Sequence, residues 1–205
     1  MKTLLISLFS LLSIVCYGQG NYEKAMGDAL QTWQNGKNSE AMSKFERIAQ
    51  AEKSNWIPRY YQAFVAATSS FQTQDSDEKE QLIQAAIKLI PTKTEDLNAE
   101  WHVLKALALT AQLTIDPMSR AMQLSPEIIH NYEQALQLEP NNPRALSGLA
   151  DFQIQSKKYM GGSTEQECKD LEKAVSLFAT EKHDTPFYPT WGRERAEATL
   201  ATCKK

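Results

Sequence analysis

The chain has 205 residues, of which 42% are hydrophobic and 23% are charged, with 8 glycines and 8 prolines. This composition excludes collagen, low-complexity disorder and a protein with several membrane spans. The formal net charge of −3 argues against a basic surface of the kind that binds nucleic acid, so we expect no nucleic-acid partner.

The first eighteen residues have the three-part pattern of a secretory signal peptide. A positive start is followed by an apolar run, Leu4–Val15, and by the small residues Cys16 and Gly18. This pattern predicts cleavage between Gly18 and Gln19. The run is shorter than the roughly 20 residues that span a bilayer. We therefore predict a signal peptide over residues 1–18 and a periplasmic or secreted mature chain without a transmembrane segment.

After the predicted cleavage site, apolar residues recur at spacings of three and four along most of the chain. This periodicity predicts helices with one apolar face, and no stretch shows the alternation of a strand. The clearest groups, in chain order, are Ala25/Ala29/Trp33, Ala41/Phe45/Ile48, Tyr60/Phe64/Ala67/Phe71, Leu82/Ala86/Leu89, Leu97/Trp101/Leu104/Ala108 and Ile128/Tyr132/Ala135/Leu138.

Turn-forming residues separate these helices. Asn35-Gly36 and the run Pro140-Asn-Asn-Pro143 mark two breaks. Ser125 followed by Pro126 has the pattern of an N-cap and first helical residue, so it predicts a new helix start there.

Several helix pairs resemble the tetratricopeptide repeat. The B-helix pattern of a small or apolar residue, an aromatic, a small residue and a proline fits Ile128, Tyr132, Ala135 and Pro140. Parts of it recur at Ala41/Phe45/Ile48, Ile83/Ala86/Pro91 and Leu171/Ala174, and the A-helix spacing recurs at Trp101/Leu104. The repeats are degenerate, because equivalent positions at 48, 86, 135 and 174 are 38, 49 and 39 residues apart, whereas the family repeat has about 34. The resemblance therefore implies that the excess residues form two long loops, over residues 116–125 and 157–164.

This resemblance implies an all-α fold, a right-handed superhelical stack of antiparallel helix pairs. We expect one domain over residues 21–205, with about four pairs and a C-terminal capping helix from Arg193. The motifs at Tyr159–Gly162 and Pro189–Gly192 resemble those of small exported tetratricopeptide proteins of Bacteroidota, a resemblance that implies architecture and compartment but no biochemical role.

Two cysteines remain after signal-peptide cleavage, Cys168 and Cys203. In an oxidising compartment such a pair is a disulfide candidate. The loop-like stretch 183–190 lies midway between them, so an antiparallel hairpin of the flanking helices would bring them together. Two separate thiols are the alternative, because bridging needs Cα atoms within about 7 Å.

Motifs for catalysis and metal binding are missing from the sequence. It contains no His-x3-His, Cys-x2-Cys or Gly-x-Ser-x-Gly pattern. The run Gly161-Gly-Ser-Thr164 lacks the lysine and spacing of a phosphate loop, and helix entry explains it. We therefore expect no enzyme, no metal site and no cofactor.

The resemblance also implies which side chains line a concave surface, since the A helices of tetratricopeptide arrays hold a peptide or partner helix. The residues predicted to face a partner are Trp33, Tyr61, Phe64, Phe71, His102, Arg144 and Asp151. The alternative for the aromatic residues is that they form core, as aromatics at helical spacing commonly do.

Three functions follow from these observations. The first is a non-catalytic protein- or peptide-binding or assembly module in the cell envelope. The second is a carrier of a small apolar ligand, in a pocket lined by Trp33, Phe64 and Trp101. The third is a hydrolase with its site in the loops 116–125 and 157–164.

Overall fold

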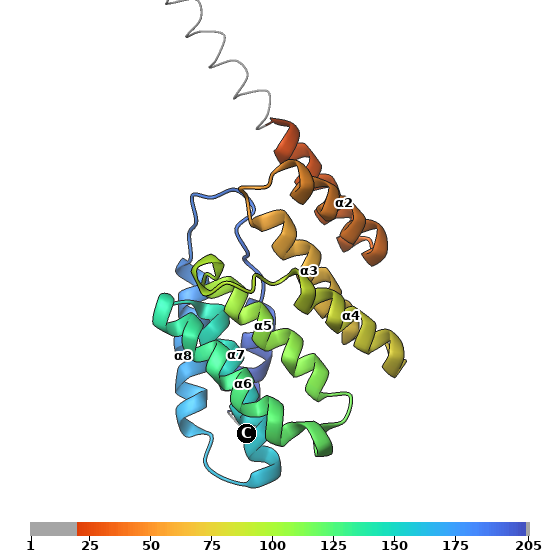
Figure 1. Cartoon of the computed structure of the whole chain (residues 1–205). Coiled ribbons are helices and arrows are strands. Elements are labelled where there is room, and N and C mark those ends of the chain that lie inside the picture. The colour runs from red at the N-terminus through yellow and green to blue at the C-terminus, as the bar shows by residue number, and fades with distance from the viewer. Residues whose placement is uncertain (1–19, 204–205) are drawn as a thin grey trace, which may run out of the picture. The chain divides into compact units, whose positions relative to one another are not determined.

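The computed structural model describes residues 20–203, and in this range every regular element is a helix (Figure 1). The predicted all-α class is therefore confirmed. The predicted signal peptide and its cleavage site lie outside the described residues. The chain divides within one helix into two compact units, Met1–Val65 and Ala66–Lys205. We describe each unit by itself, and the single domain expected over residues 21–205 stays a prediction.

The first unit contains a helix over residues 20–34, then α2 (Asn38–Ala51) and the start of α3 (Ile57–Ser70). Its core is rich in aromatic rings. Phe45 stacks on Tyr61 with 5.4 Å between centroids, and the edge of Trp33 meets Phe64 at 5.4 Å. Lys44 on α2 reaches back 2.8 Å to Asp28, which links the first two helices.

The second unit continues from the rest of α3 through seven further elements. They are α4 (Ser76–Leu89), the 3-10 turn η1 (Thr94–Asp96), α5 (Ala99–Leu113), α6 (Pro117–Leu138), α7 (Pro143–Met160), α8 (Glu165–Thr180) and α9 (Arg193–Cys203). Side-chain caps fix the starts of α4, α5, α6 and α7, because Asp75, Asn98, Asp116 and Asn142 each accept a backbone N–H three residues later.

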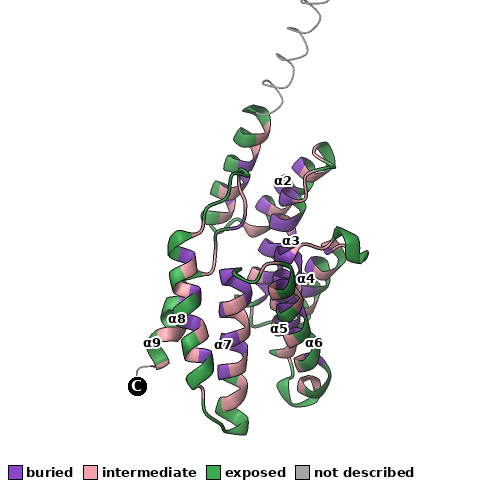
Figure 2. Ribbon diagram, turned by 90° about the vertical axis from the view of Figure 1, so that its left-hand side faces the viewer, coloured by how far each residue is buried: buried purple, intermediate pink, exposed green. Residues whose placement is uncertain are grey.

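Each helix of the second unit packs on the next one along the chain, from α4 through α9. In addition, α5 contacts α7, and α7 contacts α9. One apolar cluster joins α5, α6 and α7 around Val103, Ile128 and Phe152. A second cluster joins α7, α8 and α9 around Ile154 and Leu171. The core therefore runs through consecutive helices, as Figure 2 shows by the buried faces.

The loop predicted over residues 116–125 is wrong, because residues 117–125 are helical, and the loop predicted over 157–164 is shorter than expected and covers only residues 161–164. Helix α6 begins at Pro117, directly after its cap Asp116, and α7 continues to Met160. Pro126 lies inside α6 and does not start a new helix. Pro126 is tolerated because it is exposed. It has no N–H to donate to the carbonyl of the preceding helical turn, and water can bond that carbonyl instead. Leu124 and Ile128 on either side are buried.

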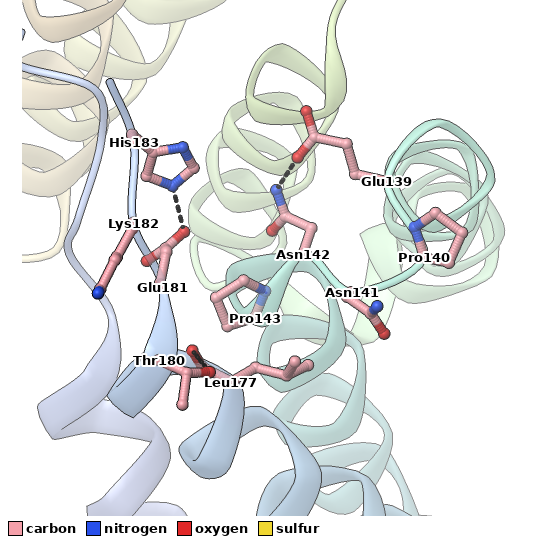
Figure 3. Close-up of a pocket in the computed structure, with 10 residues that line it drawn as sticks. All are labelled: Glu139, Pro140, Asn141, Asn142, Pro143, Leu177, Thr180, Glu181, Lys182 and His183. Atoms are coloured by element: carbon pink, nitrogen blue, oxygen red, sulfur yellow. Dashed lines mark hydrogen bonds and ion pairs between the residues drawn. The ribbon is translucent and has the colours of Figure 1, made fainter. Parts of the chain in front are cut away.

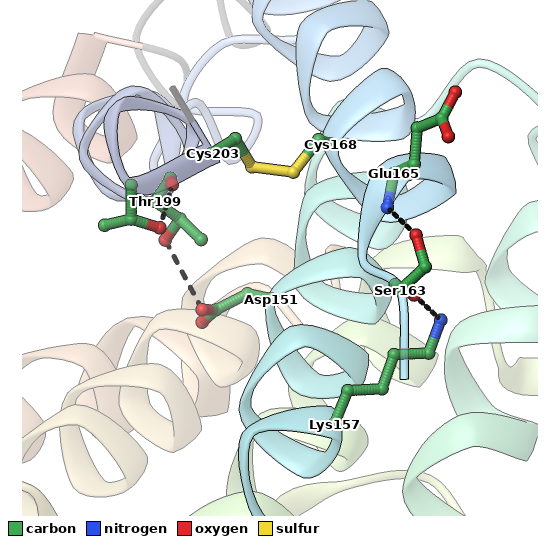
Figure 4. The surroundings of a disulfide bond; sticks show 8 residues. Asp151, Lys157, Ser163, Glu165, Cys168, Thr199 and Cys203 are labelled. Atoms are coloured by element: carbon green, nitrogen blue, oxygen red, sulfur yellow. Dashed lines mark hydrogen bonds between the residues drawn. A yellow bond between two sulfur atoms is a disulfide. The ribbon is translucent and has the colours of Figure 1, made fainter. Parts of the chain in front are cut away.

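The structure supports the disulfide between Cys168 on α8 and Cys203 on α9, with Cα atoms 5.9 Å apart (Figure 4). Helix α9 is held further by Asp151 of α7, which accepts hydrogen bonds from Arg195 Nε at 2.9 Å and from Thr199 Oγ1 at 3.3 Å. The last helix is thus fixed to α7 by hydrogen bonds and to α8 by the disulfide.

Candidate functional site

The α6–α7 hairpin has two very different ends, and each carries functional candidates. At the turn between the helices, residues 139–143 and the end of α8 line a pocket of about 390 Å3 (Figure 3). The lining is Glu139, Pro140, Asn141, Asn142, Pro143, Leu177, Thr180, Glu181, Lys182 and His183. The pocket is therefore built from two helix ends and the loop that follows α8.

A buried network centred on Arg144 lies next to this pocket. Arg144 Nε donates to both carboxylate oxygens of Glu100 at 2.9 Å, and its two terminal nitrogens bond Glu181. Asn142 Nδ2 donates to Glu100 Oε1 at 2.7 Å, and His183 Nε2 lies 2.8 Å from Glu181 Oε1. The side chains of Arg144 and Glu100 are fully buried. We call these five residues the Arg144 network.

Burial and charge shift the two acids of the network in opposite directions. Desolvation raises the pKa of Glu100, against the lowering effect of Arg144 and Asn142. Burial would also raise the pKa of Glu181, but the hydrogen bonds from Arg144 and His183 outweigh it and lower that pKa. The guanidinium group is thus shared by two carboxylates, the geometry in which arginine binds best.

The network joins distant parts of the chain, and it engages acids that line the pocket. It links α5, the start of α7 and the segment after α8, and the rings of Phe178 and Tyr188 lie about 6 Å from the guanidinium carbon. Both pocket acids, Glu139 and Glu181, are engaged by neighbouring side chains, and the lining contains no serine or cysteine. The geometry of the Arg144 network is that of a structural polar core.

The opposite end of the hairpin carries exposed apolar side chains. They belong to the start of α6 and the end of α7, which lie at the lower edge of the second unit in Figure 1. The exposed fractions are 94% for Met118, 91% for Met122, 92% for Tyr159 and 79% for Met160. We call these four residues the methionine–tyrosine cluster. Large apolar side chains left in water at two helix ends are candidates for a binding surface.

The seven residues predicted to face a partner occupy varied positions. Within the first unit, Tyr61 and Phe64 are buried in the ring stack and Trp33 is half-buried, while Phe71, at the end of α3 in the second unit, is exposed. Their role in binding stays a prediction. The pocket predicted between Trp33, Phe64 and Trp101 draws on both units, and it also stays a prediction.

The predicted polar residues lie in the second unit, and they make internal contacts. His102 is buried with Nδ1 3.2 Å from Asn131 Oδ1, and desolvation lowers its pKa. Arg144 belongs to the network above, and Asp151 holds α9. Sequence reasoning missed the partners Glu100 and Glu181 and the whole methionine–tyrosine cluster. The i, i+4 spacing of Met118 and Met122 was an available signal, although it equally indicates core.

Residues 20–203 contain neither a membrane-spanning helix nor a group of metal ligands. No helix in this range is long and apolar enough to cross a membrane. The same residues include no group of three or more His, Cys, Asp or Glu side chains placed to hold a metal ion.

Comparison with known proteins gives one informative likeness. No protein-family model matches the chain, and no curated protein matches it. Among solved structures, the HusA haemophore from Porphyromonas gingivalis matches with a TM-score of 0.77 and 26% sequence identity. The match covers 89% of this chain and 92% of that one. The chain is thus similar, over most of both lengths, to a protein described as a haemophore.

Proposed function

We propose that the protein is a non-catalytic carrier that binds a flat, largely apolar ligand of the haem class outside the cytoplasm. The observation that carries this proposal is the likeness to the HusA haemophore, at 26% identity over 89% of the chain. The function belongs to the second class considered from the sequence, a carrier of a small apolar ligand. A helical fold alone would not select it, because one fold serves many functions.

The surface chemistry of the second unit supports this choice. Haem combines a flat apolar ring with an iron atom and two carboxylates. Proteins bind its iron through histidine, cysteine, methionine or tyrosine. The methionine–tyrosine cluster offers thioether and phenol groups on exposed apolar side chains. Methionine also adapts its shape to apolar ligands, because it is unbranched and polarisable.

The peptide-docking alternative has less support from the geometry. It rests on an aromatic surface from Trp33 to Phe71, but Tyr61 and Phe64 use their rings within the first unit. Peptide-binding grooves need such anchors to be accessible. We therefore rank the carrier above the docking module.

We also propose that the helices form a tetratricopeptide-like superhelix. In such a stack, alternate helices form an inner layer, and each contacts the next member of its own layer. The contacts of α5 with α7 and of α7 with α9 support this arrangement. A small-angle scattering curve that fits an open superhelical stack would support it, and one that fits a globular bundle would oppose it.

Export is part of the same proposal. The apolar leader pattern of the sequence and the pairing of Cys168 with Cys203 both suit an oxidising compartment. Fractionation of expressing cells tests this, since the carrier is expected in the periplasm or medium with an N-terminus at Gln19.

Titration with ferric haem tests the proposed ligand class. The purified protein should produce a saturable change in the Soret absorbance of haem, at a fixed stoichiometry. Metal-free protoporphyrin IX, followed by quenching of its fluorescence, should also bind, because the ring supplies most of the apolar contact. Absence of saturable binding for both compounds would overturn the proposed function.

A further inference from the structure

We propose that the pocket at the α6–α7 turn binds a small organic cation, an ammonium or guanidinium group on a short apolar stem, with Glu139 as its anionic partner. The pocket volume of about 390 Å3 lies at the lower end of the range for small-ligand sites. Its lining shares no residue with the methionine–tyrosine cluster. The inference therefore goes beyond the carrier function and does not depend on it.

Glu139, which directly follows α6, has an acceptor oxygen to spare. Its Oε2 accepts a hydrogen bond from Asn142 Nδ2 at 3.0 Å, and this bond orients the carboxylate. Within residues 20–203, Oε1 accepts no hydrogen bond, and no lysine, arginine or histidine forms an ion pair with Glu139. Figure 3 shows the carboxylate extending from the end of α6 toward the side of the pocket lined by Glu181 and His183. Glu139 thus offers an uncompensated negative charge to a ligand.

Two helices end at the pocket, and both ends favour a cation. The last residues of α6 and α8 are Leu138 and Thr180, and neither helix has a basic residue in its last turn. The C-terminal end of a helix carries a partial negative charge. In the described part of the chain, no backbone N–H bonds the carbonyls of residues 178–180 at the end of α8. These carbonyls can therefore accept hydrogen bonds from a bound cation.

The start of α7 also lies at the pocket, with the opposite partial charge, but its first turn offers few free N–H groups. Pro143 has no N–H, and Ala145 N donates to Asn142 Oδ1 at 2.9 Å. Leu146 N donates to the backbone oxygen of Asn142 at 3.1 Å. This helix start therefore has little left with which to attract an anion.

The two basic residues of the lining do not neutralise Glu139. His183 Nε2 lies 2.8 Å from Glu181 Oε1, and its ring stacks on Tyr188 with 3.7 Å between centroids. The imidazole is therefore committed to Glu181. Lys182 is exposed, and its amine points away from Glu139 in Figure 3. A bound cation can thus approach Glu139 without displacing a basic partner from the described residues.

The charges beside the pocket also favour a cation over an anion. Three carboxylates act on the phenol of Tyr188, those of Glu100, Glu139 and Glu181, against the single guanidinium group of Arg144. Burial raises the pKa of Tyr188, and the charges of Glu100 and Glu139 raise it further. A second negative group is therefore disfavoured in this environment, and a positive group is favoured.

Apolar side chains complete the pocket and define the rest of the ligand. Pro140, Pro143 and Leu177 belong to the lining together with Glu139. A short alkyl chain gains free energy when it is buried against such side chains. Lysine and arginine side chains have this construction, a charged head on an apolar stem, and so do free alkylamines.

Compounds that share a butyl stem and differ in charge test the proposal directly. n-Butylammonium and n-butylguanidinium, titrated into isotope-labelled protein and followed by NMR, should cause saturable shifts at residues 139–143 and 177–183. Butyrate and n-butanol should cause none at the same concentrations. Absence of binding by both cations would overturn the site, and saturable binding of butyrate at these residues would overturn the preference for a cation.

The role of Glu139 is tested by Glu139→Gln, which removes the charge and keeps an amide oxygen that can accept from Asn142. It should weaken n-butylammonium binding by about tenfold or more, because hydrogen bonds to charged groups are strong. Glu133→Gln is the matched control, since Glu133 is an exposed acid on α6 outside the lining. Circular dichroism should show both variants folded. Equal affinities of the two variants would overturn the role of Glu139.

A peptide distinguishes the two sources of such a cation. A capped Ala-Lys-Ala tripeptide is titrated in parallel with n-butylammonium. Tighter binding of the peptide would indicate a protein side chain as the occupant, and equal or weaker binding would indicate a free amine. Either result supports the cation site if Glu139→Gln weakens it. Haem titration tests the carrier function separately, so each proposal can fail while the other stands.

Discussion

The two ends of the α6–α7 hairpin differ in what they bury and what they expose. At the turn, Arg144 is fully buried, and each of its nitrogens has a carboxylate partner on Glu100 or Glu181. At the other end, Met118, Met122 and Tyr159 are almost fully exposed. Both arrangements are unusual, because arginine prefers water and large apolar side chains avoid it.

This difference indicates which end maintains the fold and which end is available for a ligand. A buried charge must be satisfied internally, so the Arg144 network is complete and rigid. An exposed apolar side chain adds no stability to the free protein, so the free energy gained by burying it can still stabilise a complex with an apolar ligand. Variants of the Arg144 network at the turn should therefore mainly reduce stability, and variants at the exposed end should mainly weaken binding of an apolar ligand.

Substitution of Arg144 should have the largest effect on folding. Arg144→Met leaves Glu100 buried without its cation and should lower the free energy of unfolding by about 3–5 kcal/mol, measured by urea denaturation. The exposed pair of Arg193 with Glu197 provides the control, since Arg193→Ala should cost less than about 1 kcal/mol. Similar losses in both variants would show that the network does not stabilise the fold.

Loss of the disulfide should have the next largest effect. It closes a loop with a sequence separation of 35 and joins α8 to α9 beside the end of α7. Cys168→Ala/Cys203→Ala should lower the free energy of unfolding by about 3 kcal/mol through the entropy of the unfolded chain. The wild-type protein in reductant should show the same loss, and an unchanged midpoint in both cases would contradict a formed bridge.

The close approach in the middle of the hairpin is tested by Gly148→Ala. The new methyl group would lie 2.5 Å from the end of the Tyr132 ring, so this buried ring must shift. The cost of overpacking, about 1–3 kcal/mol, exceeds the helix-propensity gain of alanine, about 1 kcal/mol. Gly27→Ala has open space and should be stabilising or neutral. A stabilised Gly148→Ala would contradict the close contact between Gly148 of α7 and the Tyr132 ring of α6.

The smallest effect on stability is expected at the exposed end. Met118→Ser/Met122→Ser should change the free energy of unfolding by no more than about 0.5 kcal/mol per site, as at other exposed positions. The same double variant should weaken haem binding, because it removes both apolar contact and sulfur. A large loss of stability would show that these side chains are packed in the folded protein.

The periodicity of apolar residues and the positions of turn-forming residues predicted most of the helices. The groups around Phe45, Ala86, Tyr132 and Ala174 are buried on helices as expected. The prediction failed at Pro126, because a proline after serine has the same local pattern at a helix start and inside an exposed helix. The structure shows that α6 is continuous through Pro126, with Leu124 and Ile128 buried on either side.

The sequence by itself determined the helical class, the apolar leader pattern and the identity of the two cysteines that could pair. These are properties of composition and short-range spacing. The tertiary structure decided that Arg144 is buried between two acids, and that Met118, Met122 and Tyr159 remain exposed. Both facts depend on neighbours far away in the chain, and apolar residues at helical spacing have the same pattern whether or not another helix covers them.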